Sequence, residues 1–379
     1  MKFFHLADLH IGKTVHGVSM LEDQKFILDE ICSLAEKEKP DAVLICGDIY
    51  DKPAASAGAV ALLDDFLTRL AGTGAEIMII SGNHDSGERV GFGSDLLVKS
   101  GVHIAGVYTG ATKQVTLSDE YGEVTFTLLP FIKPSFVKAV YPDDDTSDYN
   151  AAIKTAVSKI PLNPEKRNVI LSHQFLTGSV TSDSEEHSVG GLDNVDASIF
   201  DEFDYVAMGH IHRPQKLLRE TLRYSGSPLK YSFSESPYDK WIPFVKMGEK
   251  GNIEIEKLPL HPLRDMKVIK GEYSTLMSQE YRSTVGKDDY IKAILTDEDE
   301  IPGAVGRLRT AYPNILSLQY ENSRTATVGA TLTETEKNLE MLPIELFSKL
   351  FSEQNGKAPE EEQKEYVKKL IEEIWDGEV

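Results

Sequence analysis

The sequence predicts a fold of the α/β or α+β class, in which a largely parallel or mixed sheet carries helices on its faces. Short apolar runs recur before residue 210, and each has the length of a buried strand. They are FFHLA (3–7), AVLIC (42–46), EIMII (76–80), NVILS (168–172) and YVAM (205–208). Helix-like segments lie between several of these runs, for example at 24–35 and 60–70. Buried runs that alternate with helices are typical of such sheets.

Two later segments have the character of β-hairpins. Residues 113–130 contain the dipeptide YG at 121–122, and residues 215–258 contain GN at 251–252. Gly and Asn tolerate the backbone angles that tight turns need. We therefore expect antiparallel strands in both segments.

The pattern changes after the dipeptide HP at 261–262. Three further strand-like runs follow, with helix-like pieces between them, in a small α+β module that ends near Asn322. The last helix-like segment of the tail has an apolar stripe at i, i+3, i+4 and i+7 spacing, formed by Val367, Leu370, Ile371 and Ile374. The predicted organisation is a main domain at 1–260, a small domain at 262–322, a linker at 323–337 and C-terminal helices at 338–379.

Composition and charge restrict the function only in part. The chain has 379 residues and is 41% hydrophobic, which is enough for a large core. Its net charge of -21 argues against binding a polyanion. The charge is uneven, however, because residues 331–379 hold six Lys and thirteen acidic residues, whereas residues 212–230 hold five basic residues and one Glu. Overall charge therefore neither supports nor excludes nucleic acid as a partner.

The chain has the features of a soluble, cytoplasmic protein. No stretch approaches the ~18 apolar residues that cross a bilayer. Asp8 interrupts the N-terminal apolar run too early for a secretory signal. Cys32 and Cys46 fall in a predicted helix and a predicted strand, so we expect two reduced core thiols.

Side chains that bind metal ions follow each of the five apolar runs. In chain order they are Asp8, His10, Asp48, Asn83, His173, His210 and His212. The carboxyl ends of parallel strands face one crevice, so we expect these seven side chains to converge. Residues two apart lie on the same side of an extended chain, so His210 and His212 can point to one place. Each motif alone is more typical of a turn or a core edge, but five in order predict a site.

The seven nitrogen and oxygen ligands exceed one tetrahedral zinc site and predict two divalent ions that share Asp48. Two ions ~3.5–4 Å apart are the usual apparatus for in-line displacement at phosphorus. Imidazole, carboxylate and amide ligands suit two Mn²⁺ ions, with Fe or Zn as alternatives and Mg²⁺ less suited. His84 follows Asn83, so we expect its side chain to face the substrate as a catalytic group, with Asp85 orienting it.

The remaining histidines lack this context, and we expect structural or surface roles for them. They are His5, His16, His103, His187 and His261. His16 and His187 stay open as neighbours of the site.

The order Asp-x-His, Gly-Asp-x-x-Asp, Gly-Asn-His-Asp, a lone His and Gly-His-x-His, across residues 8–212, resembles the calcineurin-like metallophosphoesterase superfamily. The resemblance implies a four-layer sandwich, with two facing mixed sheets flanked by helices, and a dinuclear metal site. It also implies two sets of ligands that share one residue. One set is Asp8, His10, Asp48 and His212, and the other is Asp48, Asn83, His173 and His210.

The stretch YSGSPLKYSFSE (224–235) resembles a signature of the SbcD family of nuclease subunits within that superfamily. This resemblance implies a Mn²⁺-dependent DNA nuclease that acts with an SbcC-like, SMC-type ATPase as a dimer within a heterotetramer. The implied activities are 3′–5′ exonuclease on double strands and endonuclease on single strands and hairpins, in DNA repair, recombination and replication. It further implies that residues 262–322 cap the DNA and that the C-terminal helices bind the ATPase. Asp51 departs from the pattern, because relatives often have His there, and its role stays open.

Two other functions remain as alternatives. A small-molecule nucleotide or cyclic phosphodiesterase would keep the chemistry, but it would not require the two C-terminal modules. A scaffold that tethers DNA ends would not require the seven ligands and His84. The chain contains no G-x-x-x-x-G-K-[ST] loop, so any use of ATP is expected from a partner.

Overall fold

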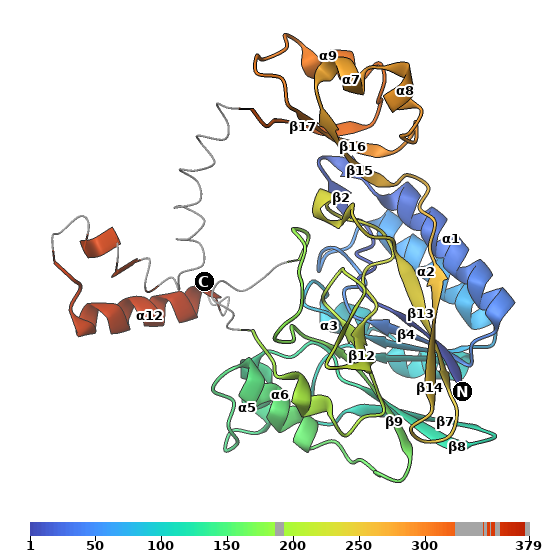
Figure 1. Cartoon of the computed structure of the whole chain (residues 1–379). Helices are drawn as coiled ribbons and strands as arrows, with labels where there is room; N and C mark the ends of the chain where they lie inside the picture. Colours follow the sequence, from blue (N-terminus) through green and yellow to red (C-terminus); the bar gives the residue numbers. More distant parts are fainter. Residues whose placement is uncertain (186–192, 323–343, 345–346, 349, 353–356, 376–379) are drawn as a thin grey trace.

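The computed structural model describes residues 1–185, 193–322, 344, 347–348, 350–352 and 357–375. Two six-stranded sheets face each other in the main domain, and helices cover the outer face of each sheet (Figure 1). The layers therefore run helix, sheet, sheet, helix, which confirms the four-layer fold that the sequence predicts.

The first sheet is built on four parallel strands. In sheet order they are β1 (Lys2–Leu6), β4 (Ala42–Cys46), β5 (Glu76–Ile80) and β6 (Val102–Ala105). The hairpin of β13 (Trp241–Met247) and β14 (Ile253–Pro259) extends this sheet beyond β1, to which β13 is antiparallel. The four parallel strands therefore end at the same edge of the sheet.

The second sheet repeats this plan. Its four parallel strands are β8 (Gly122–Leu128), β9 (Arg167–His173), β10 (Tyr205–Gly209) and β12 (Arg219–Tyr224). Antiparallel strands close both sides, β7 (Lys113–Asp119) beside β8 and β11 (Gln215–Leu217) beside β12. Both predicted hairpin segments are confirmed, but the second one is divided, because β11–β12 joins this sheet and β13–β14 joins the other.

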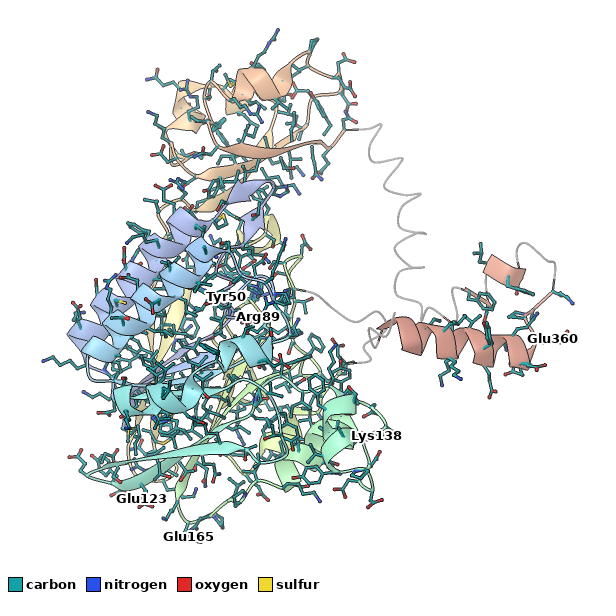
Figure 2. All side chains as sticks on the ribbon, turned by 180° about the vertical axis from the view of Figure 1, so that it is seen from behind. Tyr50, Arg89, Glu123, Lys138, Glu165 and Glu360 are labelled. Atoms are coloured by element: carbon teal, nitrogen blue, oxygen red, sulfur yellow. The ribbon has the colours of Figure 1, made fainter. Side chains whose placement is uncertain are left out.

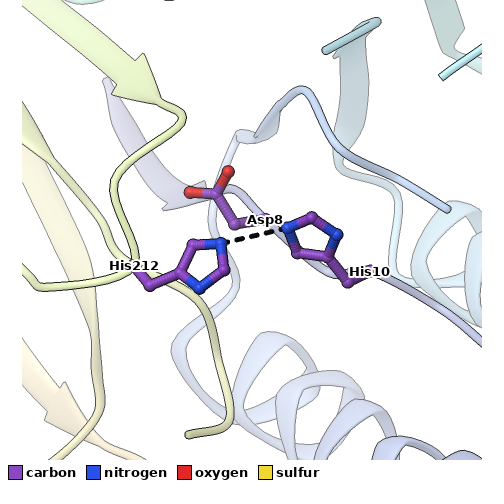
Figure 3. A group of neighbouring side chains, drawn as sticks. All are labelled: Asp8, His10 and His212. Atoms are coloured by element: carbon purple, nitrogen blue, oxygen red, sulfur yellow. Dashed lines mark hydrogen bonds between the residues drawn. The ribbon is translucent and has the colours of Figure 1, made fainter. Parts of the chain in front are cut away.

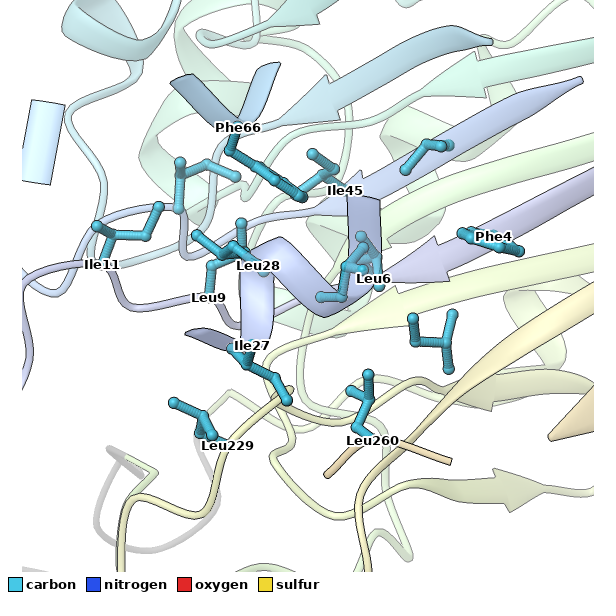
Figure 4. Close-up of a cluster of buried hydrophobic side chains, with 14 of the residues drawn as sticks. Phe4, Leu6, Leu9, Ile11, Ile27, Leu28, Ile45, Phe66, Leu229 and Leu260 are labelled. Atoms are coloured by element: carbon cyan, nitrogen blue, oxygen red, sulfur yellow. The ribbon is translucent and has the colours of Figure 1, made fainter. Parts of the chain in front are cut away.

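Helices α1 (Leu21–Glu38) and α2 (Ala57–Gly72) cover the first sheet because each has one apolar face. Figure 4 shows Ile27 and Leu28 of α1, and Phe66 of α2, around Leu6 and Ile45 of the sheet. The two helices extend beyond the segments that the sequence predicts. Burying this cluster joins the outer layer to the sheet.

Helices α5 (Pro134–Val140) and α6 (Tyr149–Ser158) cover the second sheet, with η2 (Ala197–Phe200) beside them. Asp148 caps α6, because its carboxylate accepts a hydrogen bond from the Ala151 N–H at 2.7 Å. The opposite face of this layer is polar, and Lys138 of α5 lies at the surface (Figure 2).

The inner faces of the two sheets form a second apolar core. Phe3 of β1 makes edge-on contacts with Phe126 of β8 and Tyr205 of β10, with ring centroids 5.6 and 5.4 Å apart. His5 lies in the same core, with Nδ1 3.0 Å from the Tyr205 hydroxyl and Nε2 3.2 Å from the Met208 carbonyl oxygen. Burial lowers the pKa of His5 to about 3, so this histidine is neutral and structural, as expected.

Both cysteines are free and buried, as expected, Cys32 in α1 and Cys46 at the end of β4. Burial raises the pKa of the Cys32 thiol to about 11.

The small module after residue 262 contains the three strands that the sequence predicts. They are β15 (Met266–Gly271), β16 (Tyr290–Leu295) and β17 (Ile315–Tyr320), and all three are parallel. Short helices make the connections, namely α7 (Tyr273–Leu276), α8 (Gln279–Arg282) and α9 (Ala304–Leu308). The module has a core of its own around Leu276, Ile291 and Leu308.

The remaining elements are short or terminal. They are β2 (Thr14–Val15), β3 (Val18–Ser19), α3 (Gly87–Val90), α4 (Ser94–Leu97), η1 (Val98–Ser100), η3 (Phe233–Glu235) and α12 (Glu361–Trp375). Val367, Leu370 and Ile371 lie on α12, and Leu370 is 37% exposed. The side chain of Ile374, the predicted linker at 323–337 and most of the region of the preceding helix lie outside the described residues.

A buried ionic contact joins the small module to α1. The carboxylate of Asp23 is fully buried and accepts hydrogen bonds from Arg264 and from the Tyr290 hydroxyl, both at 2.8 Å. Burial raises the pKa of Asp23 although these two partners favour its charged form. Arg264 is therefore needed to keep this carboxylate charged at the joint.

We predict that Arg264→Ala lowers the free energy of unfolding by about 2 kcal/mol, because it leaves the Asp23 carboxylate buried without its cation. Urea unfolding followed by tyrosine and tryptophan fluorescence measures this change. Lys267→Ala is the matched control, since Lys267 is exposed in its ion pair with Asp265 and should contribute less than about 0.5 kcal/mol. Adding Asp23→Asn to Arg264→Ala should restore part of the loss. Equal stability of Arg264→Ala and the wild type would contradict the assigned role.

Candidate metal centre

The loops that follow five parallel strands meet at one edge of the sandwich. Strands β1, β4 and β5 come from the first sheet, and β9 and β10 come from the second. The structure brings together all seven side chains that the sequence singles out. Donor atoms of Asp8, His10 and His212 lie within 4.8 Å of one another, as do those of Asp8, Asp48 and His173.

One part of the cluster contains Asp8, His10 and His212 (Figure 3). The Nε2 atoms of the two histidines lie 3.0 Å apart and face each other. The other ring nitrogen of His212, Nδ1, lies 2.7 Å from the Ser184 hydroxyl, so Nε2 is the atom directed into the cluster. All three side chains are almost fully buried. Imidazole nitrogens that converge in this way are typical of metal ligands.

The other part contains Asn83, His173 and His210. The amide oxygen of Asn83 lies 3.0 Å from Nε2 of His173 and 2.9 Å from Nδ1 of His210. Nδ1 of His173 donates a hydrogen bond to the Cys46 carbonyl oxygen at 2.8 Å. This bond fixes the tautomer, because a carbonyl can only accept, and it leaves Nε2 of His173 to act as a ligand.

Asp48 lies between the two parts. Its Oδ2 atom is 3.5 Å from Nε2 of His10 and 3.4 Å from Nε2 of His173. Burial raises the pKa of Asp48, but the neighbouring His173 and His10 outweigh burial and hold that pKa well below its usual value. Asp48 is therefore ionised, and one of its oxygens faces both parts of the cluster.

The electrostatics of the cluster fit a bound cation. Oδ2 of Asp8 is buried and has no hydrogen-bond partner among the described residues. Burial raises the pKa of Asp8 to about 6, since a buried carboxylate without compensating charge is unfavourable. A divalent ion would reverse this cost, so the donor set fits a divalent-metal site.

The backbone at the site is strained. Four of the predicted ligands have φ in the left-handed region, with values of 54° for Asp8, 44° for His10, 50° for Asp48 and 100° for His210. Such angles are unfavourable for residues other than Gly, and they persist where surrounding structure enforces them. Here the hydrogen bonds from Asp8 N to Gly47 O and from His10 N to Asp48 O hold the loops together.

Three motif glycines allow the strands to approach this closely. A Cβ atom on Gly47 would lie 2.2 Å from Nδ1 of His173, and one on Gly82 would lie 2.1 Å from Oδ1 of Asp48. A Cβ atom on Gly209 would lie 1.8 Å from the Cys46 carbonyl oxygen. The glycines of the Gly-Asp, Gly-Asn-His and Gly-His motifs are therefore required by packing at the site.

His84 lies beside the cluster, with its ring centroid 4.9 Å from that of His10. Its backbone N–H donates to Oδ1 of Asp48 at 2.9 Å, and its Nδ1 lies 3.2 Å from the Asp51 carbonyl oxygen. The Asp85 carboxylate instead accepts hydrogen bonds from three backbone N–H groups, those of Ile49, Tyr50 and Gly82. Asp85 thus fixes the two loops, and the Asp51 carbonyl contacts the His84 ring, while the expectation that Asp85 orients His84 stays a prediction.

The side chain of Asp51 also has an identifiable environment. Its Oδ1 atom lies 2.7 Å from the Lys13 ammonium and 3.7 Å from Nδ1 of His10. Asp51 thus lies near Nδ1 of His10 without a hydrogen bond to it, while Nε2 of His10 faces His212.

Sequence reasoning missed the residues that hold His212. Glu235 is fully buried, forms an ion pair with Lys240 and accepts a hydrogen bond from Ser184, whose hydroxyl contacts His212. Lys240 in turn donates to the His212 carbonyl oxygen at 2.7 Å. The one available signal was Ser-x-x-Glu at 232–235, which forms a capping box in η3.

Of the histidines set aside by the sequence, His5, His103 and His261 contact groups outside the cluster, whereas His16 lines a groove with Ser184, which contacts His212. His103 contacts Glu76, and the exposed His261 contacts Glu30. His16 stacks on Phe233 with ring centroids 5.5 Å apart, while His187 lies outside the described residues. Among the described helices, none is long and apolar enough to cross a membrane.

Comparisons with known proteins agree with this geometry. Residues 1–214 match the model of the calcineurin-like phosphoesterase family, and residues 262–355 match the SbcD_C model, described as the type 5 capsule protein repressor C-terminal domain. The chain is similar to the D subunit of the nuclease SbcCD from Staphylococcus epidermidis, with 34% identity over 322 residues, 84% of this chain and 85% of the relative.

Two solved structures show weaker similarity. A dimetal phosphatase from Danio rerio has a TM-score of 0.39 and 11% identity, covering 69% of this chain and 98% of its own. The protein TT1561 of Thermus thermophilus has a TM-score of 0.38 and 10% identity, covering 68% of this chain and 98% of its own.

We predict that Gly82→Ala weakens binding of divalent metal about 10- to 100-fold, because the new methyl group would displace Asp48. Calorimetric titration with Mn²⁺ as the probe ion measures the change. Gly72→Ala is the control, since a Cβ atom there would meet nothing within 4 Å. If Gly82→Ala bound the ion as tightly as Gly72→Ala, the close approach at Asp48 would not matter for the site.

Proposed function

This chain belongs to the calcineurin-like phosphoesterase family, within its SbcD branch of metal-dependent phosphodiester hydrolases, and we propose that it is the Mn²⁺-dependent DNA nuclease subunit of a complex with an SbcC-like ATPase. The proposed activities are 3′–5′ exonuclease on double strands with the ATPase, and endonuclease on single strands and hairpins. Its proposed role is the processing of DNA ends in the cytoplasm during repair, recombination and replication.

The observation that carries this proposal is the position of Asp48 between two sets of nitrogen and oxygen donors. Asp8, His10 and His212 would complete one metal site with Asp48, and Asn83, His173 and His210 would complete the other. The donors are imidazoles, carboxylates and an amide, a combination that suits Mn²⁺ better than Mg²⁺. When bound, two such ions supply the Lewis acidity that activates water and neutralises charge on the phosphoryl oxygens.

His84 would act on the leaving group. A carbonyl oxygen only accepts, so Nδ1 of His84 carries the proton that faces Asp51 and Nε2 is the nitrogen that gains or loses one. Protonated at Nε2, His84 can donate to the oxygen that leaves phosphorus. The hydrogen bond from the backbone N–H of His84 to Asp48 places the His84 ring beside the carboxylate that both metal sites would share.

A groove near the metal centre supports a polymeric substrate. A groove of ≈ 470 Å³ is lined by Lys13, His16 and Tyr231 from the main domain and by Lys292 and Gln319 from the small module. Ser184, which contacts His212, also lines it. A small phosphodiester would not need walls from two modules, so this groove favours DNA over the small-molecule alternative. The presence of all seven donors and His84 disfavours a pure tethering role.

The ATPase partner is proposed to bind α12. This helix is rich in Glu, and Tyr366 and Leu370 are 65% and 37% exposed on it. An amphipathic helix with exposed apolar side chains suits a groove or a helix of a partner.

A second copy of the chain is proposed to cover the segment around α3 and α4. Phe92 is 86% exposed and Leu96 is 81% exposed, which is unusual for large apolar side chains. Both residues follow the loop of Asn83 and His84 in the chain, after α3. A dimer that pairs these segments would bring two metal centres to one DNA end.

For the nuclease, we predict Mn²⁺-dependent cleavage of labelled single-stranded and duplex DNA that chelator abolishes. Asp48→Ala should lose both ion binding and cleavage, since it removes the shared donor. His84→Ala should keep ion binding but lose about 10²- to 10⁴-fold in cleavage rate, because only proton transfer is removed. Gel assays give the rate, and calorimetry gives the bound Mn²⁺.

His103→Ala is the matched control, because His103 contacts Glu76 on neighbouring strands of the sheet. Turnover of a phosphomonoester without DNA cleavage, also in the presence of the ATPase, would favour the small-molecule alternative. Intact ion binding without any cleavage would favour the tethering scaffold.

For the dimer, we predict that Phe92→Asp with Leu96→Asp converts the protein to a monomer in sedimentation equilibrium. A charged side chain cannot be buried at an apolar interface without a large cost. Tyr121→Asp, at the exposed β7–β8 turn, should leave the mass unchanged. A wild-type monomer at micromolar concentration would refute this interface.

A further inference from the structure

A second groove, with a volume of ≈ 670 Å³, opens where edge strands of the two sheets lie opposite each other. Strands β11 and β12 of the second sheet form one wall, and β13 and β14 of the first sheet form the other. The lining side chains that matter here are Arg213, Lys216, Glu220, Arg223, Trp241 and Lys257.

Arg223 is the unusual residue of this groove. It is 5% exposed, and its guanidinium has no hydrogen bond or ion pair among the residues that the structure describes, with Nε buried and unpaired. The guanidinium instead lies over the ring of Trp241, whose centroid is 5.1 Å from Cζ. A buried Arg without a hydrogen bond or an ion pair is costly, so its charge calls for an anion that enters from the groove.

Two more cations line the groove without an ion pair in the described part of the chain. The Lys257 ammonium lies 4.7 Å from the centroid of Trp241, and the Arg213 guanidinium lies 5.3 Å from that of Tyr238. Lys216 differs, because it pairs with Glu220. Four cations, Arg213, Lys216, Arg223 and Lys257, face the single carboxylate of Glu220 in this groove, which contrasts with the net charge of -21 for the chain. The groove is therefore a local site for negative charge.

Two pairs of consecutive residues link the lining of the groove to the metal centre. Arg213 follows His212, and Trp241 follows Lys240, which donates to the His212 carbonyl oxygen at 2.7 Å. The segment that carries Ser184 also contributes Val180 to the lining, where its N–H donates to Gln215 at 2.9 Å. The walls of the groove are thus continuous with the loops that hold His212.

We propose that this groove binds the phosphates of one nucleic-acid strand that continues from the metal centre. Arg guanidinium groups match phosphate oxygens well, and a row of cations beside an aromatic ring is typical of grooves that follow a single strand. The inference rests on the proposed nuclease function, since it names the path of that enzyme's substrate.

The test measures binding of a labelled 20-nucleotide thymidine strand in chelator, by fluorescence anisotropy over a range of salt concentrations. Lys257→Glu should raise the Kd about 5- to 10-fold, and it should reduce the slope of log Kd against log salt by about 0.7 for each phosphate that is no longer neutralised. Arg223→Met should act in the same direction. Lys138→Glu makes the same charge change on α5, outside the groove, and should leave the Kd within about twofold of wild type.

Hydrolysis of bis(p-nitrophenyl) phosphate with Mn²⁺ separates this inference from the proposed function. Lys257→Glu should hydrolyse this small diester within about twofold of wild type, which shows that the variant is folded and active. If the wild type hydrolysed no phosphodiester, the proposed nuclease function would be refuted. The anisotropy experiment would still show whether the groove binds a strand.

Three outcomes would overturn the groove itself. They are equal strand affinity of Lys257→Glu and Lys138→Glu, competition by thymidine monophosphate as strong as by the strand, and an equal loss of duplex binding.

Discussion

The structure depends on how closely the two sheets approach each other at the ends of their parallel strands. Asp48 leaves the first sheet and His173 leaves the second, yet Oδ2 of Asp48 lies 3.4 Å from Nε2 of His173. Gly47, Gly82 and Gly209 make this approach possible, because each would otherwise place a Cβ atom inside a neighbouring group. The apolar core between the sheets supplies the free energy that holds strained ligand loops at this edge.

Polar side chains connect the loops of the metal centre to α1 and to the small module. Neighbouring residues at the start of α1 have separate tasks: Gln24 donates to the His10 carbonyl oxygen at 2.7 Å, and Asp23 binds Arg264 of the small module. At His212, Lys240 donates a hydrogen bond to the backbone carbonyl oxygen, and Glu235 forms an ion pair with Lys240. The small module and the loop of His10 are therefore both held by the start of one helix.

The local distribution of charge matters more for binding than the net charge of the molecule. An acidic protein can act on a polyanion when its cations gather where the polymer passes, and here Arg213, Arg223 and Lys257 line one groove while Lys13 and Lys292 line another. Screening by salt reduces the repulsion from distant acidic groups more than the attraction of contacts in a groove.

The sequence by itself determined the parallel strands, the helices between them and the identity of the donors, because these depend on periodicity and on which side chain follows each strand. Asp8, His10, Asp48, Asn83, His173, His210 and His212 could all be named from such local signals. Only the tertiary structure decided that β11–β12 and β13–β14 join different sheets, that Asp85 fixes loops, that Glu235 supports His212 and that Arg223 is buried over Trp241 with its Nε lacking a hydrogen bond in the described part of the chain. These features arise between residues far apart in the chain, and a sequence pattern carries no signal for the partner that a side chain meets across a core.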